Sequence, residues 1–232
     1  IMSPTQTCTV AEWQTPAAEH INDMLYRGEL PIICGGTGFY IQSITDGVVL
    51  PEVPPNAKLR KNLLKKSADE LVIILRKLDP KRLKTIDQKN PVRLIRAIEI
   101  ASKIGKVPEF KKEKSSYDIM QIGLKIPDEK LRQKIHDRLV ERMKIGMIRE
   151  SEKLHKNGLS FKRMRSLGLE YRYLADLIEN TLTKDEFLKK METEIWQYSR
   201  RQMTWFKRDK KIKWFEPKEH KQIENEILKF LT

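Results

Sequence analysis

A glycine-rich stretch with one threonine is the first candidate for chemistry. Residues 31–40 read PIICGGTGFY. The apolar run predicts a buried strand over Pro31–Cys34, and the glycines predict a turn after it. Glycine tolerates positive φ and lets the backbone approach a ligand closely, while the Thr37 hydroxyl can donate or accept a hydrogen bond. The alternative is an ordinary strand-to-helix turn whose glycines serve only steric needs.

A pair of arginines at helical spacing is the second candidate. Residues 87–100 read DQKNPVRLIRAIEI, and Asn90 is a good helix N-cap. Arg93 and Arg96 are three residues apart, so they share a helix face that could grip phosphates or stack on bases. The alternative is a solvated face paired to Glu99, which is the commoner fate of helix arginines.

Basic and aromatic residues alternate near the C-terminus. Residues 200–208 read RRQMTWFKR and end a helix that we expect to begin with the capping box of Thr183 and Glu186. This mixture is typical of single-stranded nucleic-acid sites. Residues 163–172 (RMRSLGLEYR) could likewise hold an RNA backbone and stack a base, or form an ordinary corner between two helices.

The composition favours a polyanionic partner. The 232 residues include 46 Lys and Arg against 32 Asp and Glu, a net charge of +14. Nucleic acid is the simplest partner, although an acidic membrane surface or phosphorylated substrates stay open. No apolar run approaches about 18 residues, so no membrane span is predicted. The two cysteines fit a reducing cytoplasm, and no side chains have the spacing of a metal site.

These candidates need a scaffold, and its elements follow from caps and apolar periodicity. A helix is expected from the N-cap Thr9 to about Arg27, with Pro16 tolerable only if the helix really begins near Thr15. Strands are expected over 117–126 and near 212–215. Prolines at 51, 54 and 55 indicate a domain boundary, after which the chain is dense in charge and reads as short helices.

Taken together, these stretches resemble the tRNA dimethylallyltransferase family, also called tRNA isopentenyltransferases. The resemblance covers nearly the whole chain and implies an α/β fold with a P-loop NTPase-like core. That core would comprise 1–50 and 117–232, and a mostly helical insertion at 51–116 would contact tRNA. The matching stretches stand in the family's order at 31–40, 87–100, 131–146, 165–171 and 200–208.

The resemblance implies a reaction and its partners. Family members transfer a dimethylallyl group from dimethylallyl diphosphate to N6 of the adenosine just 3′ of the tRNA anticodon, and Mg²⁺ assists. For this chain we therefore expect a cytoplasmic monomer that binds dimethylallyl diphosphate and the anticodon stem-loop of tRNA, with no membrane association.

The resemblance also implies site residues. Thr37 would face the adenosine, and Arg138 would lie near the diphosphate, so both are expected to be catalytic. One departure from the family stands at 168–172, where Gly-Leu-Glu-Tyr-Arg replaces the common Gly-Tyr-Arg and leaves contacts near Tyr171 open. The implied tRNA contacts are Thr37, Arg60, Arg93, Arg96, Arg165, Gly168, Arg200, Arg201, Gln202, Trp205 and Lys207.

One part of the family's machinery has no match in the sequence. No G-x-x-x-x-G-K-[ST] occurs in residues 1–232, and the resemblance places that loop and the base aspartate upstream of Ile1. We therefore expect a fragment that does not catalyse alone. Two alternatives stay open: a cytokinin-type enzyme that prenylates free adenine nucleotides, and a non-catalytic RNA-binding protein. The basic helical insertion at 56–115 and the 200–208 run favour the larger substrate over a free nucleotide.

Overall fold

The computed structural model describes residues 2–109 and 115–232 of the chain, which forms two compact units. The first unit comprises Ile1–Ile41 and Tyr117–Thr232, and the second comprises Gln42–Ser116. Val53 lies among the prolines that indicate a boundary, yet its side chain is buried within the second unit. The functional division into 1–50 with 117–232 and 51–116 stays a prediction.

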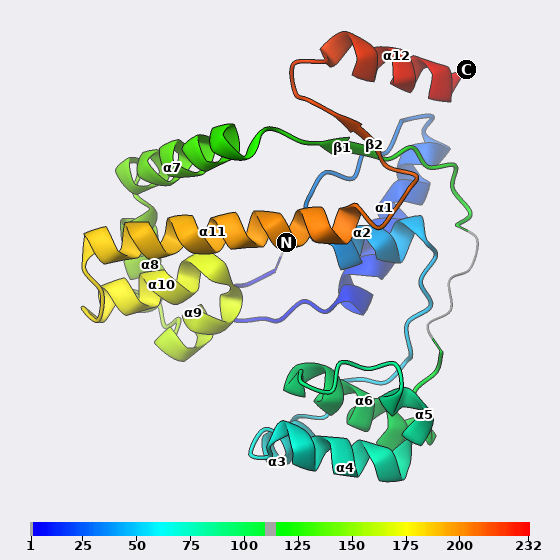
Figure 1. Cartoon of the computed structure of the whole chain (residues 1–232), viewed down its shortest axis with the longest axis vertical. Helices are drawn as coiled ribbons and strands as arrows, with labels where there is room; N and C mark the ends of the chain where they lie inside the picture. The colour runs from blue at the N-terminus through cyan, green and yellow to red at the C-terminus, as the bar shows by residue number, and fades with distance from the viewer. Residues whose placement is uncertain (1, 110–114) are drawn as a thin grey trace. The chain divides into compact units, whose positions relative to one another are not determined.

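Helices dominate both units, and two short strands form the sheet (Figure 1). The elements in chain order are α1 (Val10–Tyr26), α2 (Gly38–Thr45), α3 (Ala57–Leu63), α4 (Ala68–Leu78), α5 (Pro80–Leu83), α6 (Pro91–Ile104), β1 (Ile122–Leu124), α7 (Asp128–Ile145), α8 (Met147–Lys156), α9 (Phe161–Leu167), α10 (Leu169–Ile178), α11 (Lys184–Phe206), β2 (Lys213–Phe215) and α12 (His220–Leu231).

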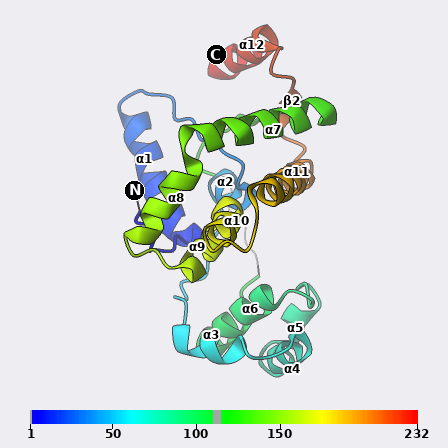
Figure 2. The same ribbon diagram turned by 90° about the vertical axis from the view of Figure 1, so that its left-hand side faces the viewer.

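The first unit is built around the long helix α11. Its predicted start is confirmed, because the Thr183 hydroxyl caps the helix and the Glu186 carboxylate completes the capping box. Phe187 and Met191 of α11 are fully buried with Leu139 of α7. Helices α7 and α10 both pack against α11, as Figures 1 and 2 show. This packing fixes the direction in which the end of α11 points.

The sheet is smaller than the sequence suggests. β1 and β2 pair in parallel with Gly123 opposite Trp214, so both expected strand regions contain a strand, although β1 is shorter than 117–126. The strand expected over Pro31–Cys34 is wrong: these residues are irregular, and Ile32 is 79% exposed. A buried strand needs a hydrogen-bonded neighbour, and none of the described residues pairs with this segment. The α/β fold class is confirmed.

The first helix begins earlier than Pro16 suggests. Thr9 caps α1 and Glu12 completes the capping box, as the sequence predicts. The expected start near Thr15 is wrong, because Pro16 lies inside the helix. Proline within a helix costs one backbone hydrogen bond and crowds the carbonyl four residues earlier, whereas the capping box satisfies the N–H groups of Thr9 and Glu12 at the helix start.

The second unit packs α3, α4 and α6 around a leucine-rich core. Helix α6 begins at Pro91 after the N-cap Asn90 and ends before Gly105, as predicted. Leu75 of α4 and Leu94 of α6 are fully buried in this core. The core therefore orients α6 and the arginines that it carries.

We expect Leu75→Ala to destabilise the second unit by about 3 kcal/mol, because it leaves a cavity in a packed core. Hydrogen exchange of the α6 amides measures this local stability. The matched control is Ile73→Ala on the same helix, where the side chain is 52% exposed. Equal acceleration of exchange in both variants would contradict the assignment of this core.

Candidate functional site

The glycine turn packs against the end of α11. Gln202 donates a hydrogen bond from Nε2 to the carbonyl oxygen of Gly36 at 2.9 Å. A Cβ added to Gly36 would overlap the Gln202 amide, and one added to Gly38 would overlap the Trp205 indole. Neither glycine has a positive φ, so close packing and not backbone conformation requires glycine here. Two stretches singled out in the sequence, 31–40 and 200–208, therefore come together.

Aromatic contacts hold the turn from both sides. The Phe39 ring meets the edge of Trp205 with their centroids 6.4 Å apart. On the other side Tyr40 stacks on Trp13 at 5.2 Å, and its hydroxyl donates a hydrogen bond to the carbonyl oxygen of Cys8 at 3.0 Å. The turn is thus fixed between α1 and α11.

Thr37 lies exposed in the middle of this turn. Its carbonyl oxygen accepts hydrogen bonds from the backbone N–H groups of Tyr40 at 3.0 Å and Ile41 at 3.2 Å, which begins helix α2. Across the described ranges, its hydroxyl forms no hydrogen bond to another residue. The backbone of Thr37 is therefore fixed by helix α2, and its hydroxyl stays available to a ligand.

The basic residues at the end of α11 differ in their surroundings. Arg200 pairs with Asp128 at 2.9 Å, and its guanidinium lies 5.7 Å from the centroid of the Trp196 ring. Arg201 is exposed, and its guanidinium lies 5.9 Å from the Tyr198 ring centroid. Lys207 is exposed at the C-cap of the helix. Arg201 and Lys207 are exposed and form no ion pair among the described residues, so a polyanion could reach both.

The other candidates of the first unit lie on α7 and at the α9–α10 corner. Arg138 is exposed on α7. Arg165 pairs with Asp176 at 2.7 Å and also with Glu179, and these hydrogen bonds raise its pKa. Gly168 joins the two helices with a φ of +134°, a conformation that favours glycine. The corner alternative therefore describes this segment, and its contact with tRNA stays a prediction.

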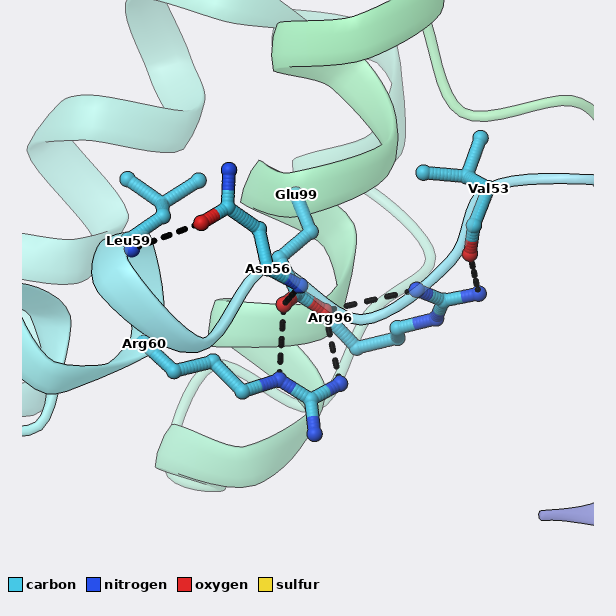
Figure 3. Close-up of polar contacts among 6 residues, drawn as sticks. All are labelled: Val53, Asn56, Leu59, Arg60, Arg96 and Glu99. Atoms are coloured by element: carbon cyan, nitrogen blue, oxygen red, sulfur yellow. Dashed lines mark hydrogen bonds and ion pairs between the residues drawn. The ribbon is translucent and has the colours of Figure 1, made fainter.

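Two arginines of the second unit converge on one buried carboxylate (Figure 3). The Glu99 side chain is only 1% exposed. Arg60 donates from Nε to Oε1 and from Nη2 to Oε2, both at 2.7 Å. Arg96 donates from Nη1 to Oε2 at 3.3 Å, and the Asn56 backbone N–H donates to Oε1 at 2.8 Å. The predicted alternative, pairing with Glu99, is therefore observed for Arg96.

These contacts set the charge state of the cluster. Burial raises the pKa of Glu99, but hydrogen bonds from Arg60 and the Asn56 backbone outweigh it and hold that pKa below its ordinary value. The hydrogen bond to Glu99 also raises the pKa of Arg60. Two guanidinium cations thus surround one carboxylate anion, and the Arg60 and Arg96 side chains stay 40% and 35% exposed.

Arg93 stands apart from this cluster. Its side chain is 61% exposed and lies 3.7 Å from Asp87. The shared helix face of Arg93 and Arg96 therefore does not give them a shared partner. The sequence analysis considered that the helix arginines Arg93 and Arg96 pair with Glu99 on the same helix. It did not predict that Arg60 and the Asn56 backbone also bind this carboxylate. Arg96 and Glu99 are three residues apart, whereas Arg60 and Glu99 are separated by 39, and no local signal links them.

We expect Gly38→Ala to displace the Trp205 indole, because the added methyl group would overlap the ring. A shift in tryptophan fluorescence and a loss of stability of about 2 kcal/mol should follow. The matched control is Gly35→Ala, since a Cβ at Gly35 meets nothing within 4 Å and its φ is not positive. Identical spectra for the two variants would argue against the packing described here.

We expect Glu99 to titrate below its ordinary pKa of about 4.3 when its side-chain carboxyl is followed by carbon NMR. Because the folded state lowers this pKa, the interaction stabilises the protein at neutral pH, and that stabilisation is lost as the pH falls through the folded pKa. Arg60→Ala should raise the pKa of Glu99, since burial is then opposed by fewer hydrogen bonds.

Arg93→Ala is the control for this titration, because Arg93 lies beside Asp87 and not beside Glu99. It should leave the pKa of Glu99 where it is. A Glu99 that titrates normally in the unchanged protein, or that responds equally to both substitutions, would contradict the ion-pair geometry.

None of the helices in the described part of the chain is long and apolar enough to cross a membrane. Nor do its histidine, cysteine, aspartate and glutamate side chains gather in threes or more where they could hold a metal ion. The groups that the candidate site offers a ligand are the Thr37 hydroxyl, the Gln202 amide, the Trp205 ring and the Arg201 guanidinium.

Comparison with known proteins places this geometry in a family. The family model described as IPP transferase matches residues 1–209. The chain is 36% identical over 211 residues to tRNA dimethylallyltransferase 2 of Trichlorobacter lovleyi, covering 90% of this chain and 68% of that protein. It is 34% identical over 239 residues to the tRNA dimethylallyltransferase of Anoxybacillus flavithermus, covering 100% of this chain and 76% of that protein.

A solved structure agrees with the sequence relatives. The crystal structure of a tRNA isopentenylpyrophosphate transferase from Bacillus halodurans matches with a TM-score of 0.70 at 26% identity, covering 100% of this chain and 76% of that chain. The fold, the glycine turn on α11 and the extent of the family match lead to one conclusion. This chain belongs to the IPP transferase family, whose relatives include the tRNA dimethylallyltransferases.

Proposed function

We propose that this chain serves the transfer of a dimethylallyl group from dimethylallyl diphosphate to N6 of the adenosine 3′ of a tRNA anticodon. The observation that carries the proposal is the glycine turn with an exposed Thr37 hydroxyl, seated on Gln202 and Trp205 of α11 in a member of this family. Relatives named tRNA dimethylallyltransferase support the reaction type.

The chemistry explains why such groups are needed. An adenine amine is a poor nucleophile, so it must be oriented and lose a proton as the bond forms, while the leaving diphosphate gains negative charge. The exposed hydroxyl of Thr37 can hydrogen-bond an adenine placed against the turn. The exposed guanidinium of Arg138 supplies a positive charge suited to a diphosphate. We assign these two residues their roles on that basis.

The acceptor side calls for cations and stacking groups. An adenosine must leave the base stack to reach a pocket, which costs a few kcal/mol that contacts to flanking phosphates can offset. Exposed Arg93, Arg201 and Lys207 suit such contacts directly. The complete proposed set of tRNA contacts is Thr37, Arg60, Arg93, Arg96, Arg165, Gly168, Arg200, Arg201, Gln202, Trp205 and Lys207.

The proposal also includes assistance by Mg²⁺, a cytoplasmic location and a monomeric state. The described residues form no cluster of three or more metal-binding side chains, and Mg²⁺ is commonly held by one or two side chains together with substrate phosphates, so the diphosphate would supply most of its ligands. We therefore propose no step that passes through the ion. A cytoplasmic monomer is proposed, in keeping with a tRNA substrate.

A free adenine nucleotide is the competing acceptor. Net charge of +14 and exposed cations on α6 and at the end of α11 favour a long polyanion over a single nucleotide. A non-catalytic RNA-binding protein would use the same exposed cations of each unit and would differ only in lacking the chemistry. The acceptor can thus be tested by binding, independently of turnover.

The testing experiment measures binding of a labelled tRNA anticodon stem-loop by fluorescence anisotropy, with AMP as competitor. We expect the stem-loop to bind, an excess of AMP to leave it bound, and replacement of the target adenosine by guanosine to weaken it. Displacement by AMP would favour the nucleotide enzyme. Equal affinity for the guanosine stem-loop would favour a general RNA-binding role.

Arg201→Ala should weaken stem-loop binding and reduce the slope of log K against log salt by about 1, because one phosphate contact is lost. The matched control is Lys190→Ala, which removes an exposed cation from the same helix at a position outside the proposed contacts. If the two variants change the slope equally, Arg201 contributes only general charge.

A further inference from the structure

One buried carboxylate ties together three segments of the second unit. Glu99 lies on α6, Arg60 lies on α3, and the backbone N–H of Asn56 belongs to the segment before α3. Arg96 adds a bond from Nη2 to the carbonyl oxygen of Val53 at 2.8 Å. Figure 3 shows Arg60, Arg96 and Asn56 around the carboxylate, with Val53 bonded to Arg96. Glu99 therefore holds the Arg60 guanidinium through two hydrogen bonds, and it shares the Arg96 guanidinium with the carbonyl oxygen of Val53.

Both guanidinium groups keep donors for a further partner. Arg60 uses Nε and Nη2 on Glu99, and among the described residues its Nη1 donates no hydrogen bond. Arg96 uses Nη1 and Nη2, which leaves its Nε. The nitrogens Arg60 Nη1 and Arg96 Nε are also absent from the buried atoms that lack a hydrogen bond in the described part of the chain, so both are accessible. With side chains 40% and 35% exposed, these groups can reach solvent or a ligand.

We infer that Glu99 is a positioning residue that holds Arg60 and Arg96 as a preformed binding pair for a phosphate of the RNA backbone. This inference rests on the proposed function. Two cations against one carboxylate leave an excess positive charge, which suits a phosphate. Long arginine side chains lose rotamer freedom on binding, and a bidentate carboxylate that fixes them beforehand reduces that loss.

The inference opposes what charge alone predicts. Glu99→Gln removes a negative charge beside two arginines, so simple electrostatics predicts equal or tighter RNA binding. Positioning predicts the reverse, because a neutral amide cannot accept both hydrogen bonds of the Arg60 fork. The sign of the effect therefore distinguishes the two explanations.

The matched control is Asp79→Asn in the same unit. Asp79 is also buried, at 6% exposure, but among the described residues it accepts hydrogen bonds only from the backbone N–H groups of Arg82 at 3.1 Å and Val107 at 2.8 Å. This variant removes the same charge from the same unit and also weakens its structure. It leaves Arg60 and Arg96 in place.

The experiment measures anisotropy of a labelled anticodon stem-loop with the full chain at several NaCl concentrations. We expect Glu99→Gln to weaken binding about tenfold and Asp79→Asn to leave it within about twofold. Equal or tighter binding by Glu99→Gln overturns the inference, as does an equal loss in both variants. Failure of the unchanged chain to bind the stem-loop instead overturns the proposed function.

A second measurement tests the phosphate pair without RNA. Inorganic phosphate is titrated while the Nε–Hε signals of Arg60 and Arg96 are followed by nitrogen NMR. We expect both signals to shift in the unchanged chain and in Asp79→Asn, and to respond weakly in Glu99→Gln. Absence of any shift in the unchanged chain overturns the inference, whatever the RNA measurement shows.

Discussion

A carboxylate that folding removes from water must find cations and donors, and this constraint organises the second unit. Glu99 is almost completely buried, and three groups with separate chain origins converge on it: the Arg60 fork, Arg96 and the backbone of Asn56. Removing any one of them would leave a buried charge less well compensated, which is costly. The second unit therefore holds its linker, α3 and α6 in one arrangement, and its arginines inherit that arrangement.

The first unit depends on a different constraint, which is that two positions of the glycine turn, Gly36 and Gly38, must lack a side chain. Gly36 and Gly38 let Gln202 and Trp205 approach the turn more closely than any Cβ would allow. Thr37 lies within this turn, so the contacts of the turn with α11 also determine where the Thr37 backbone lies. Since α11 is itself fixed by Phe187 and Met191 in the core, the position of the turn derives from the packing of the whole unit.

Sequence patterns predicted what is decided locally and failed where distant segments decide. The caps at Thr9, Asn90 and Thr183 were predictable because each cap bonds within three residues. The strand predicted over Pro31–Cys34 does not form, because a strand needs a hydrogen-bonded neighbour and the apolar pattern of a segment does not show whether it has one. The hydrogen bond from Gln202 to Gly36 joins residues that are 166 positions apart. Residue patterns therefore indicated each stretch as a candidate site but could not predict their contact.

The arginines show why the basic charge of a chain does not by itself locate its binding surface. Arg60, Arg96, Arg165 and Arg200 are paired with carboxylates, whereas Arg138 and Arg201 are exposed and form no ion pair within the described ranges. Pairing reduces the long-range attraction of a guanidinium, but its fork has more donors than one carboxylate uses. A paired arginine can thus orient a bound ligand, because its position is fixed, whereas an unpaired arginine attracts a polyanion from a distance. The first unit contains both kinds, because Arg165 and Arg200 are paired whereas Arg138 and Arg201 are not, and a protein that must both attract a polyanion and orient one nucleotide needs both.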